Sequence, residues 1–179
     1  MRCAVRPPAL PLDVTEPDWR AAEACALPAP LARWLRDTGS LTAALRGLPG
    51  RFGVTLLGPA WQAQDQDWQC RQVLLCLDER PLVWALTRVP REQLDQAPAL
   101  AGLGDRPLGE WLFSQPDLRR EPLVLADFAA VPAFVAALAG WGCPPPTGAL
   151  WGRRSWLSSG PVRLQLTEVF LPHAPPYEE

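Results

Sequence analysis

The fold prediction for this chain starts from residues 160–172, which have the sequence GPVRLQLTEVFLP. Every second residue from Val162 to Phe170 is apolar except Glu168, and the positions between them are mostly polar. This period of two is typical of a β-strand, in which successive side chains point to opposite faces. One face would pack on a hydrophobic core, and the other would meet water. The unusual feature is the single carboxylate of Glu168 on the apolar face.

Neighbouring segments predict further strands and several short helices. The expected strands occupy residues 51–58, 70–90, 120–128 and 151–172. Two of these segments are expected to be hairpins, with turns at residues 78–81 and 158–161. The expected helices occupy residues 15–26, 29–39, 41–48, 90–104, 106–113 and 129–140. Residues 61–68 fit either a polar connection or an exposed strand, and residues 1–14 an irregular N-terminal segment. Strands joined as hairpins, with helices before and between them, indicate one α+β domain over residues 1–179, with helices packed on an antiparallel sheet.

Composition excludes several classes of function. The formal charge is −2 and 20% of the residues are charged, which argues against disorder and against a nucleic-acid binder with a basic face. All 17 basic residues are arginine, so Schiff-base chemistry and a P-loop lysine are excluded. A serine or cysteine nucleophile activated by histidine would depend on the single histidine, His173, which we expect at the surface of the C-terminal tail.

The cysteines and the longest apolar segment indicate a cytoplasmic protein. The five cysteines are an odd number without CxxC spacing, and one histidine does not complete a usual zinc site, so we expect reduced thiols and no metal. Residues 128–141 are apolar but are interrupted by Pro132 and are too short to span a bilayer. With near-neutral charge and no clear exposed apolar stripe, a monomer without stable membrane insertion is expected.

Arg71 is a second charged residue on an apolar face. It shares its side of the first hairpin strand with Val73 and Leu75. If the hairpin loop is residues 79–80, Arg88 lies directly opposite Arg71 and points the same way. Like charges that face each other destabilise a sheet, unless a carboxylate or another anion lies between the two guanidinium groups.

Two interpretations of these inward charges remain open from the residues alone. The first is a structural ion pair inside the core, between Glu168 and either Arg71 or Arg88, since buried charges of opposite sign pair with each other. The second is an enclosed cavity for a small anionic ligand, with an arginine binding its carboxylate and Glu168 contacting a hydroxyl. Arg153 and Arg154 lie on opposite faces of their strand, so at most one of them faces the core.

Four stretches in sequence order resemble the chorismate pyruvate-lyase (chorismate lyase) family. They are LARWLRDTGSLTAALR (31–46), RQVLLCLDERP (71–81), LGDRPLGEWLF (103–113) and LWGRRSWLSSGPVRLQLTEVFLPHAPPY (150–177). Together they span most of the chain. The resemblance implies a small bacterial enzyme of ubiquinone biosynthesis that converts chorismate to 4-hydroxybenzoate and pyruvate without a cofactor.

The resemblance also implies roles for four residues. Arg71 would bind the ring carboxylate, Glu168 would meet the hydroxyl and assist proton movement, and main-chain amides at Leu41 and Leu108 would contact the ligand. Small loops at the last two positions would cover an enclosed pocket.

The sequence departs from the family pattern at two places. Leu86-Thr87-Arg88 stands where the family usually has Arg-Thr before the proline that closes the hairpin, so the arginine is displaced by two positions. Residues 126–150 are longer than the family's connection, as expected for an extra outer helix or a modified lid.

Two other functions are compatible with the same residues. A non-catalytic sensor of small aromatic or carboxylic acids would normally follow a DNA-binding winged helix, and the segment before Leu31 has neither the length nor the basic residues for one. A degenerate homologue would bind 4-hydroxybenzoate and turn chorismate over slowly. The presence of both Arg71 and Glu168 argues against it.

Overall fold

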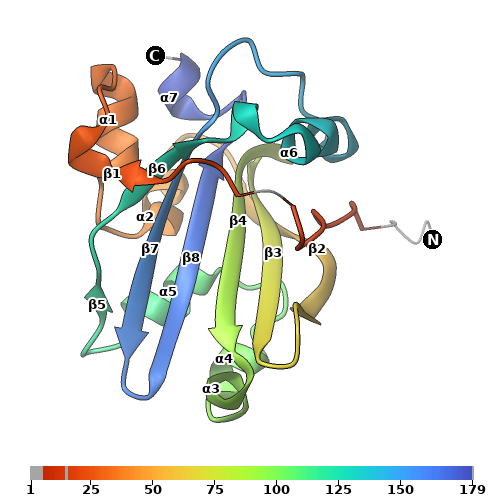
Figure 1. The fold of residues 1–179 in the computed structure, drawn as a ribbon, viewed down its shortest axis with the longest axis vertical. Helices are drawn as coiled ribbons and strands as arrows, with labels where there is room; N and C mark the ends of the chain where they lie inside the picture. Colours follow the sequence, from red (N-terminus) through yellow and green to blue (C-terminus); the bar gives the residue numbers. More distant parts are fainter. Residues whose placement is uncertain (1–5, 15, 179) are drawn as a thin grey trace.

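The computed structural model describes residues 6–14 and 16–178, which form an α+β fold with one antiparallel sheet (Figure 1). The eight-stranded sheet has the order β1-β6-β7-β8-β4-β3-β2, and β5 pairs with β7 beside β6. The strands are β1 (Arg20–Ala21), β2 (Phe52–Ala63), β3 (Trp68–Leu77), β4 (Arg80–Pro90), β5 (Arg119–Arg120), β6 (Val124–Asp127), β7 (Trp151–Ser159) and β8 (Val162–Phe170). Both predicted hairpins, β3–β4 and β7–β8, are confirmed.

Short helices connect the strands. The α-helices are α1 (Ala29–Leu35), α2 (Leu41–Arg46), α3 (Arg91–Asp95), α4 (Pro98–Ala101), α5 (Leu108–Phe113), α6 (Pro132–Ala137) and α7 (Pro175–Glu178). The 3-10 turns are η1 (Ala22–Ala24), η2 (Phe128–Ala130) and η3 (Leu138–Trp141). As predicted, Ser40 caps α2, because its Oγ accepts a hydrogen bond from the Ala43 N–H at 3.2 Å.

The predicted helix over residues 15–26 is wrong. Thr15 lies outside the described residues, residues 16–19 are irregular, and Arg20–Ala21 pair with β6 as the edge strand β1. Helical structure is limited to the single turn η1. Residues 61–68, left open by the sequence, extend β2 to Ala63 and then turn into β3.

The register of the β3–β4 hairpin differs from the expected one. Its turn is at Asp78 and Glu79, which both have positive φ (49° and 66°), as a two-residue hairpin turn requires. A bulge then shifts the pairing by one residue, so Arg71 lies opposite Thr87 and not opposite Arg88. The prediction that Arg88 shares a face with Arg71 is therefore wrong.

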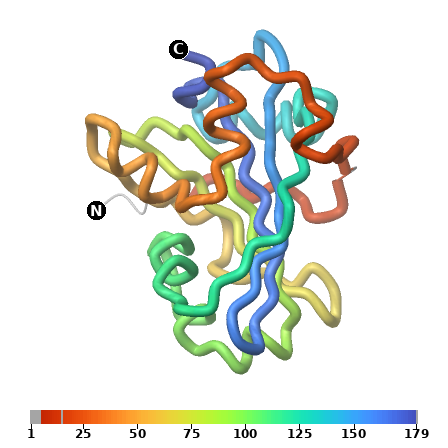
Figure 2. The backbone as a smooth tube through the Cα atoms, turned by 90° about the vertical axis from the view of Figure 1, so that its left-hand side faces the viewer, coloured from red at the N-terminus to blue at the C-terminus, as the bar shows by residue number. Residues whose placement is uncertain are grey.

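The two faces of the sheet carry different layers, which Figure 2 separates. We call them the Arg71 face and the Trp84 face, after one buried residue on each. Helices α1 and α2 and the segment of α3–α5 cover the Arg71 face. The N-terminal residues 6–14 and the segment η2–α6–η3 cover the Trp84 face, where Trp84, Phe128, Phe134 and Trp141 pack against one another.

The segment over residues 126–150 therefore lies on the far side of the sheet from Arg71. Its aromatic residues build the hydrophobic core of the Trp84 face, and this position does not allow it to cover the Arg71 face as a lid. A helix was expected over residues 129–140, and the structure has the three consecutive turns η2, α6 and η3 there.

Two further predictions concern thiols and membranes. The four cysteines within the described residues are free and buried, whereas Cys3 lies outside them. In the part of the chain that the structure describes, every helix is too short or too polar to cross a bilayer.

Candidate functional site

A cavity lies on the Arg71 face, between the sheet and the helices α2 and α5. It encloses about 480 Å³ of empty space, including its mouth. All four residues implied by the resemblance, Arg71, Glu168, Leu41 and Leu108, line it. The remaining lining is mostly apolar, with side chains from β2, β3, β4, β8 and α5. The charged groups of Arg71 and Glu168 thus face a largely apolar space.

Glu168 is held by two arginines at one end of this cavity. It lies on β8 between Ala85 of β4 and Arg153 of β7, and the residue is only 6% exposed. Its Oε2 accepts a hydrogen bond from Arg153 Nε at 2.7 Å and lies 3.6 Å from Arg120 Nη2. The expected ion pair of Glu168 with Arg71 or Arg88 is therefore wrong, and the partners are Arg153 and Arg120.

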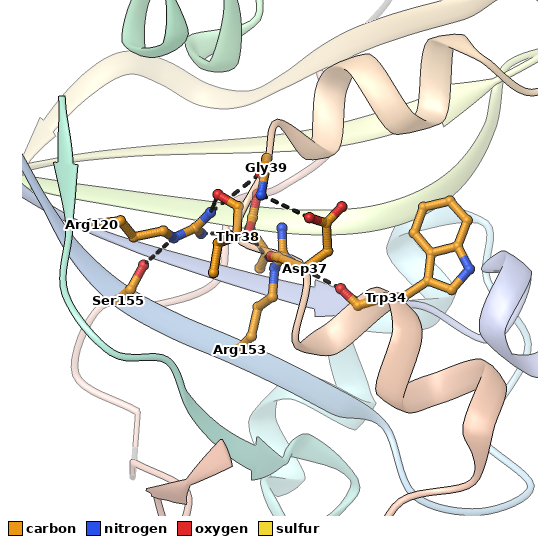
Figure 3. Close-up of polar contacts among 8 residues, drawn as sticks. Trp34, Asp37, Thr38, Gly39, Arg120, Arg153 and Ser155 are labelled. Carbon is orange, nitrogen blue, oxygen red and sulfur yellow. Dashed lines mark hydrogen bonds and ion pairs between the residues drawn. The ribbon is translucent and has the colours of Figure 1, made fainter. Parts of the chain in front are cut away.

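Arg153 and Arg120 also fix the turn between α1 and α2 (Figure 3). Arg153 Nη1 donates to the carbonyl oxygens of Trp34 at 2.9 Å and Asp37 at 2.6 Å. Arg120 Nε donates to Ser155 Oγ at 2.8 Å, and its Nη1 contacts the carbonyl oxygens of residues 38 and 39 at 3.1 and 3.4 Å. The Trp34 carbonyl belongs to the last turn of α1, where intrahelical donors are lacking, and the other three belong to the turn that follows. The two guanidinium groups therefore satisfy these carbonyls and join the α1–α2 segment to Glu168.

Arg71 occupies the other end of the cavity and is 2% exposed. Its Nη2 donates to the carbonyl oxygens of Gly104 at 2.9 Å and Arg106 at 2.8 Å, and its Nε donates to Gly104 at 3.3 Å. Burial lowers the pKa of the Arg71 guanidinium to about 10, while the charge of Asp105 acts in the opposite direction. The side chain is therefore charged at neutral pH, and an anionic ligand would compensate its desolvation.

The two charged ends are separated by the geometry of the sheet. β4 lies between β3, which carries Arg71, and β8, which carries Glu168. Arg71 is opposite Thr87 and Glu168 is opposite Ala85, which is two residues further along β4. Strand spacing then places their backbones about 10 Å apart across the sheet and about 7 Å along it.

Helices α2 and α5 cover the cavity and touch each other. Leu41 and Leu108 are the first residues of the two helices, so their N–H groups have no intrahelical acceptor. The contact is close at Gly109, where a Cβ atom would lie 2.7 Å from Thr42 Oγ1. Only a glycine allows this approach, which brings both helix starts to the same cavity.

Arg88 and Arg154 lie on the opposite face of the sheet. They line a separate cavity on the Trp84 face, in which Arg88 Nε donates to Gln64 Oε1 at 2.8 Å. Arg154 pairs with Glu16 at 2.9 Å. Arg153 and Arg154 lie on opposite faces of β7, as predicted. Each face carries a hydrophobic core, and the two side chains are only 1% and 13% exposed, so the prediction that at most one of them faces the core is wrong. Arg88 does not contribute to the Arg71 cavity.

The sequence analysis did not identify Arg120 and Arg153 as partners of Glu168. For Arg153 a signal existed, since counting outward from the β7–β8 turn places it directly opposite Glu168. Arg120 gave no comparable signal. It reaches the cavity because β5 pairs with β7, and this long-range pairing has no counterpart in the local pattern.

The described residues contain no evident set of metal ligands. No group of three or more histidine, cysteine, aspartate or glutamate side chains could hold an ion within residues 6–14 and 16–178. His173 is half-buried and is absent from the lining of the Arg71 cavity.

Comparison of the sequence with known proteins shows the family to which the chain belongs. The chorismate lyase family model matches residues 14–178. A probable chorismate pyruvate-lyase of Halorhodospira halophila is 40% identical over 159 residues, covering 81% of this chain and 83% of the relative. Proteins of the same name from Shewanella loihica and Pseudoalteromonas atlantica are 38% and 35% identical, with coverage of 82% and 83% of both chains respectively. The chain therefore belongs to the chorismate lyase family.

Proposed function

We propose that this protein is a chorismate pyruvate-lyase, which converts chorismate to 4-hydroxybenzoate and pyruvate and so supplies ubiquinone biosynthesis. The observation that carries the proposal is the placement of Arg71 and Glu168 at opposite ends of one mostly apolar cavity, in a member of this family. The ring of 4-hydroxybenzoate has a carboxylate and a hydroxyl at opposite positions. The cavity offers a cation for the first group and a hydrogen-bond acceptor for the second.

The reaction is an elimination that makes the ring aromatic. The bond between ring carbon 3 and the ether oxygen breaks, and ring carbon 4, which carries the hydroxyl, loses its hydrogen as a proton. The electron pair of that C–H bond forms the new ring double bond, and the ether electrons leave with enolpyruvate. Enolpyruvate then takes up a proton and becomes pyruvate. Electrons move only within the substrate, so no oxidant or reductant is required.

Each proposed site residue has one role in this step. Arg71 binds the ring carboxylate, and the main-chain N–H groups of Leu41 and Leu108 contact the bound ring's polar groups. Glu168 accepts the hydrogen bond of the ring hydroxyl and takes the proton from ring carbon 4, which carries that hydroxyl, while Arg153 keeps the Glu168 carboxylate in position. Anchoring both ends in a water-poor cavity favours the reactive conformer.

We also propose that the protein acts as a monomer in the cytoplasm, without a cofactor and without nucleic acid as a partner. Among the described residues, Phe113 is the one large hydrophobic side chain that is exposed, and it lines the cavity. Such a surface offers little apolar area for a permanent interface. The free buried thiols suit a reducing compartment.

The experiment that tests the proposal is turnover of chorismate by the wild type and by Glu168→Gln. The wild type should release 4-hydroxybenzoate, and Glu168→Gln should lose at least 100-fold in kcat, within the usual range for removal of a general base. Glu121→Gln is the matched control, because Glu121 is half exposed and also pairs with an arginine. If the wild type binds 4-hydroxybenzoate but does not consume chorismate, the protein is a sensor and the proposal fails.

A further inference from the structure

We propose that Arg120 binds the carboxylate of the enolpyruvyl group of chorismate, and that it thereby distinguishes the dianionic substrate from the monoanionic product. This inference rests on the proposed lyase function and assigns a residue to the half of the substrate that leaves. It starts from the lining of the Arg71 cavity, where Arg71 and Arg120 are the two cationic side chains among the described residues. Chorismate has two carboxylates.

The position of Arg120 fits the second carboxylate. If the ring carboxylate binds Arg71, the ring hydroxyl lies at Glu168, at the other end of the cavity. The enolpyruvyl ether is attached to the ring carbon next to the one with the hydroxyl, so its carboxylate also comes to this end. Arg120 lines the cavity there, beside Glu168. Arg153 contacts Glu168 as well, but it does not line the cavity and is 1% exposed.

The contacts of Arg120 leave it able to serve a ligand. Its Nη2 lies 3.6 Å from Glu168 Oε2, whereas Arg153 Nε donates to the same oxygen at 2.7 Å. Glu168 therefore keeps its close partner when Arg120 turns one nitrogen toward a substrate. Ser155 and the carbonyl oxygens of residues 38 and 39 hold Nε and Nη1 meanwhile, so the guanidinium stays oriented. Arginine binds carboxylates well in such a fixed geometry.

The charge balance of the site points to a dianion. Arg71 and Arg153 are buried, the Arg120 side chain is 9% exposed, and the one buried carboxylate among the described residues of the site is Glu168. A dianionic ligand compensates the excess of two positive charges, and a monoanionic product leaves one uncompensated. Burial lowers the pKa of the Arg120 guanidinium, with the charge of Glu168 acting against it, which indicates that Arg120 is desolvated. A second carboxylate would offset that cost.

The test compares ligands with one and two carboxylates in Arg120→Gln. The probes are 4-hydroxybenzoate and 3-(carboxymethoxy)-4-hydroxybenzoate, which has an ether-linked carboxylate beside the hydroxyl. Binding is measured by isothermal titration and turnover by kcat and KM for chorismate. Arg120→Gln should weaken binding of the two-carboxylate probe by about 30-fold or more, the range for a buried charge pair. Its affinity for 4-hydroxybenzoate should change by less than about threefold.

Two further variants keep the test decisive. Arg119→Gln is the matched control, because Arg119 is exposed on the same short strand. This variant should bind both probes with the affinity of the wild type. Arg120→Lys retains the positive charge but not the paired N–H donors of a guanidinium. It should therefore keep part of the preference for the two-carboxylate probe that Arg120→Gln loses. If Arg120→Gln weakens both probes equally or neither, the inference is overturned and Arg120 only supports the fold. Because the probes bind without reacting, this result is independent of chorismate turnover, whose absence would instead contradict the lyase function.

Discussion

Replacement of Arg153 by methionine should destabilise the protein strongly. The guanidinium is 1% exposed and donates to Glu168 at 2.7 Å and to the carbonyl oxygens of Trp34 and Asp37 at 2.9 and 2.6 Å. Without it, the Glu168 carboxylate stays buried with Arg120 as its remaining partner at 3.6 Å. Breaking one side of a buried ion pair costs about 3–5 kcal/mol. This is a large part of the about 5–15 kcal/mol by which a domain is typically stable.

A double-mutant cycle isolates the interaction from the loss of packing. Urea unfolding of the wild type, Arg153→Met, Glu168→Leu and the double variant gives the four free energies. The double variant should be more stable than Arg153→Met alone by about 1–3 kcal/mol, because apolar side chains then replace both charges. Arg163→Met is the matched control: Arg163 pairs with Glu121 while half exposed, so its loss should cost at most about 1 kcal/mol.

Additive effects in this cycle would refute the reasoning. If the two single changes sum to the double change within about 0.5 kcal/mol, Arg153 and Glu168 do not interact in solution. The orientation of Glu168 in the cavity would then need another explanation.

Three other predictions follow from the same geometry. Arg71→Met should weaken 4-hydroxybenzoate binding by about 2–5 kcal/mol in isothermal titration, because the buried carboxylate loses its charged partner; unchanged affinity would remove Arg71 from the site. Gly109→Ala should accelerate product release in stopped-flow displacement, because the new Cβ would lie 2.7 Å from Thr42 Oγ1 and separate the two covering helices; an unchanged release rate would show that this contact does not close the cavity. Burial raises the pKa of Cys70 and of Cys143 to about 11, above the pKa of an unfolded thiol. The unfolded state therefore loses its thiol protons first, and the free energy of unfolding should fall as pH rises from about 9 to 11. Urea unfolding at pH 8 and pH 10 tests this, and equal stability at both would contradict it.

The local sequence pattern predicted the sheet and one end of the site. Strict alternation in β8 identified Glu168 as an inward carboxylate, and the same argument placed Arg71 correctly, because both strands are regular around these residues. Ser40 and the apolar positions after it predicted α2 for the same local reason. These elements needed no information about distant contacts.

The errors arose where pairing over long sequence distances decides the structure. The bulge next to Cys76 moved Arg88 to the other face, and a bulge leaves alternation within each strand almost unchanged. The segment after Thr15 had a helix-like start, but Arg20 and Ala21 pair with β6 instead, because this edge of the sheet accepts a strand. Arg120 depends on the pairing of β5 with β7 and could not be assigned from its neighbours.

The most direct test of the central claim is a crystal structure of the protein with 4-hydroxybenzoate. The account predicts the ligand in the Arg71 cavity, with its carboxylate at Arg71 and its hydroxyl at Glu168, beneath α2 and α5. The structure also has a cavity on the Trp84 face, lined by Arg88 and Arg154. Ligand bound there, with the Arg71 cavity empty, would contradict the account.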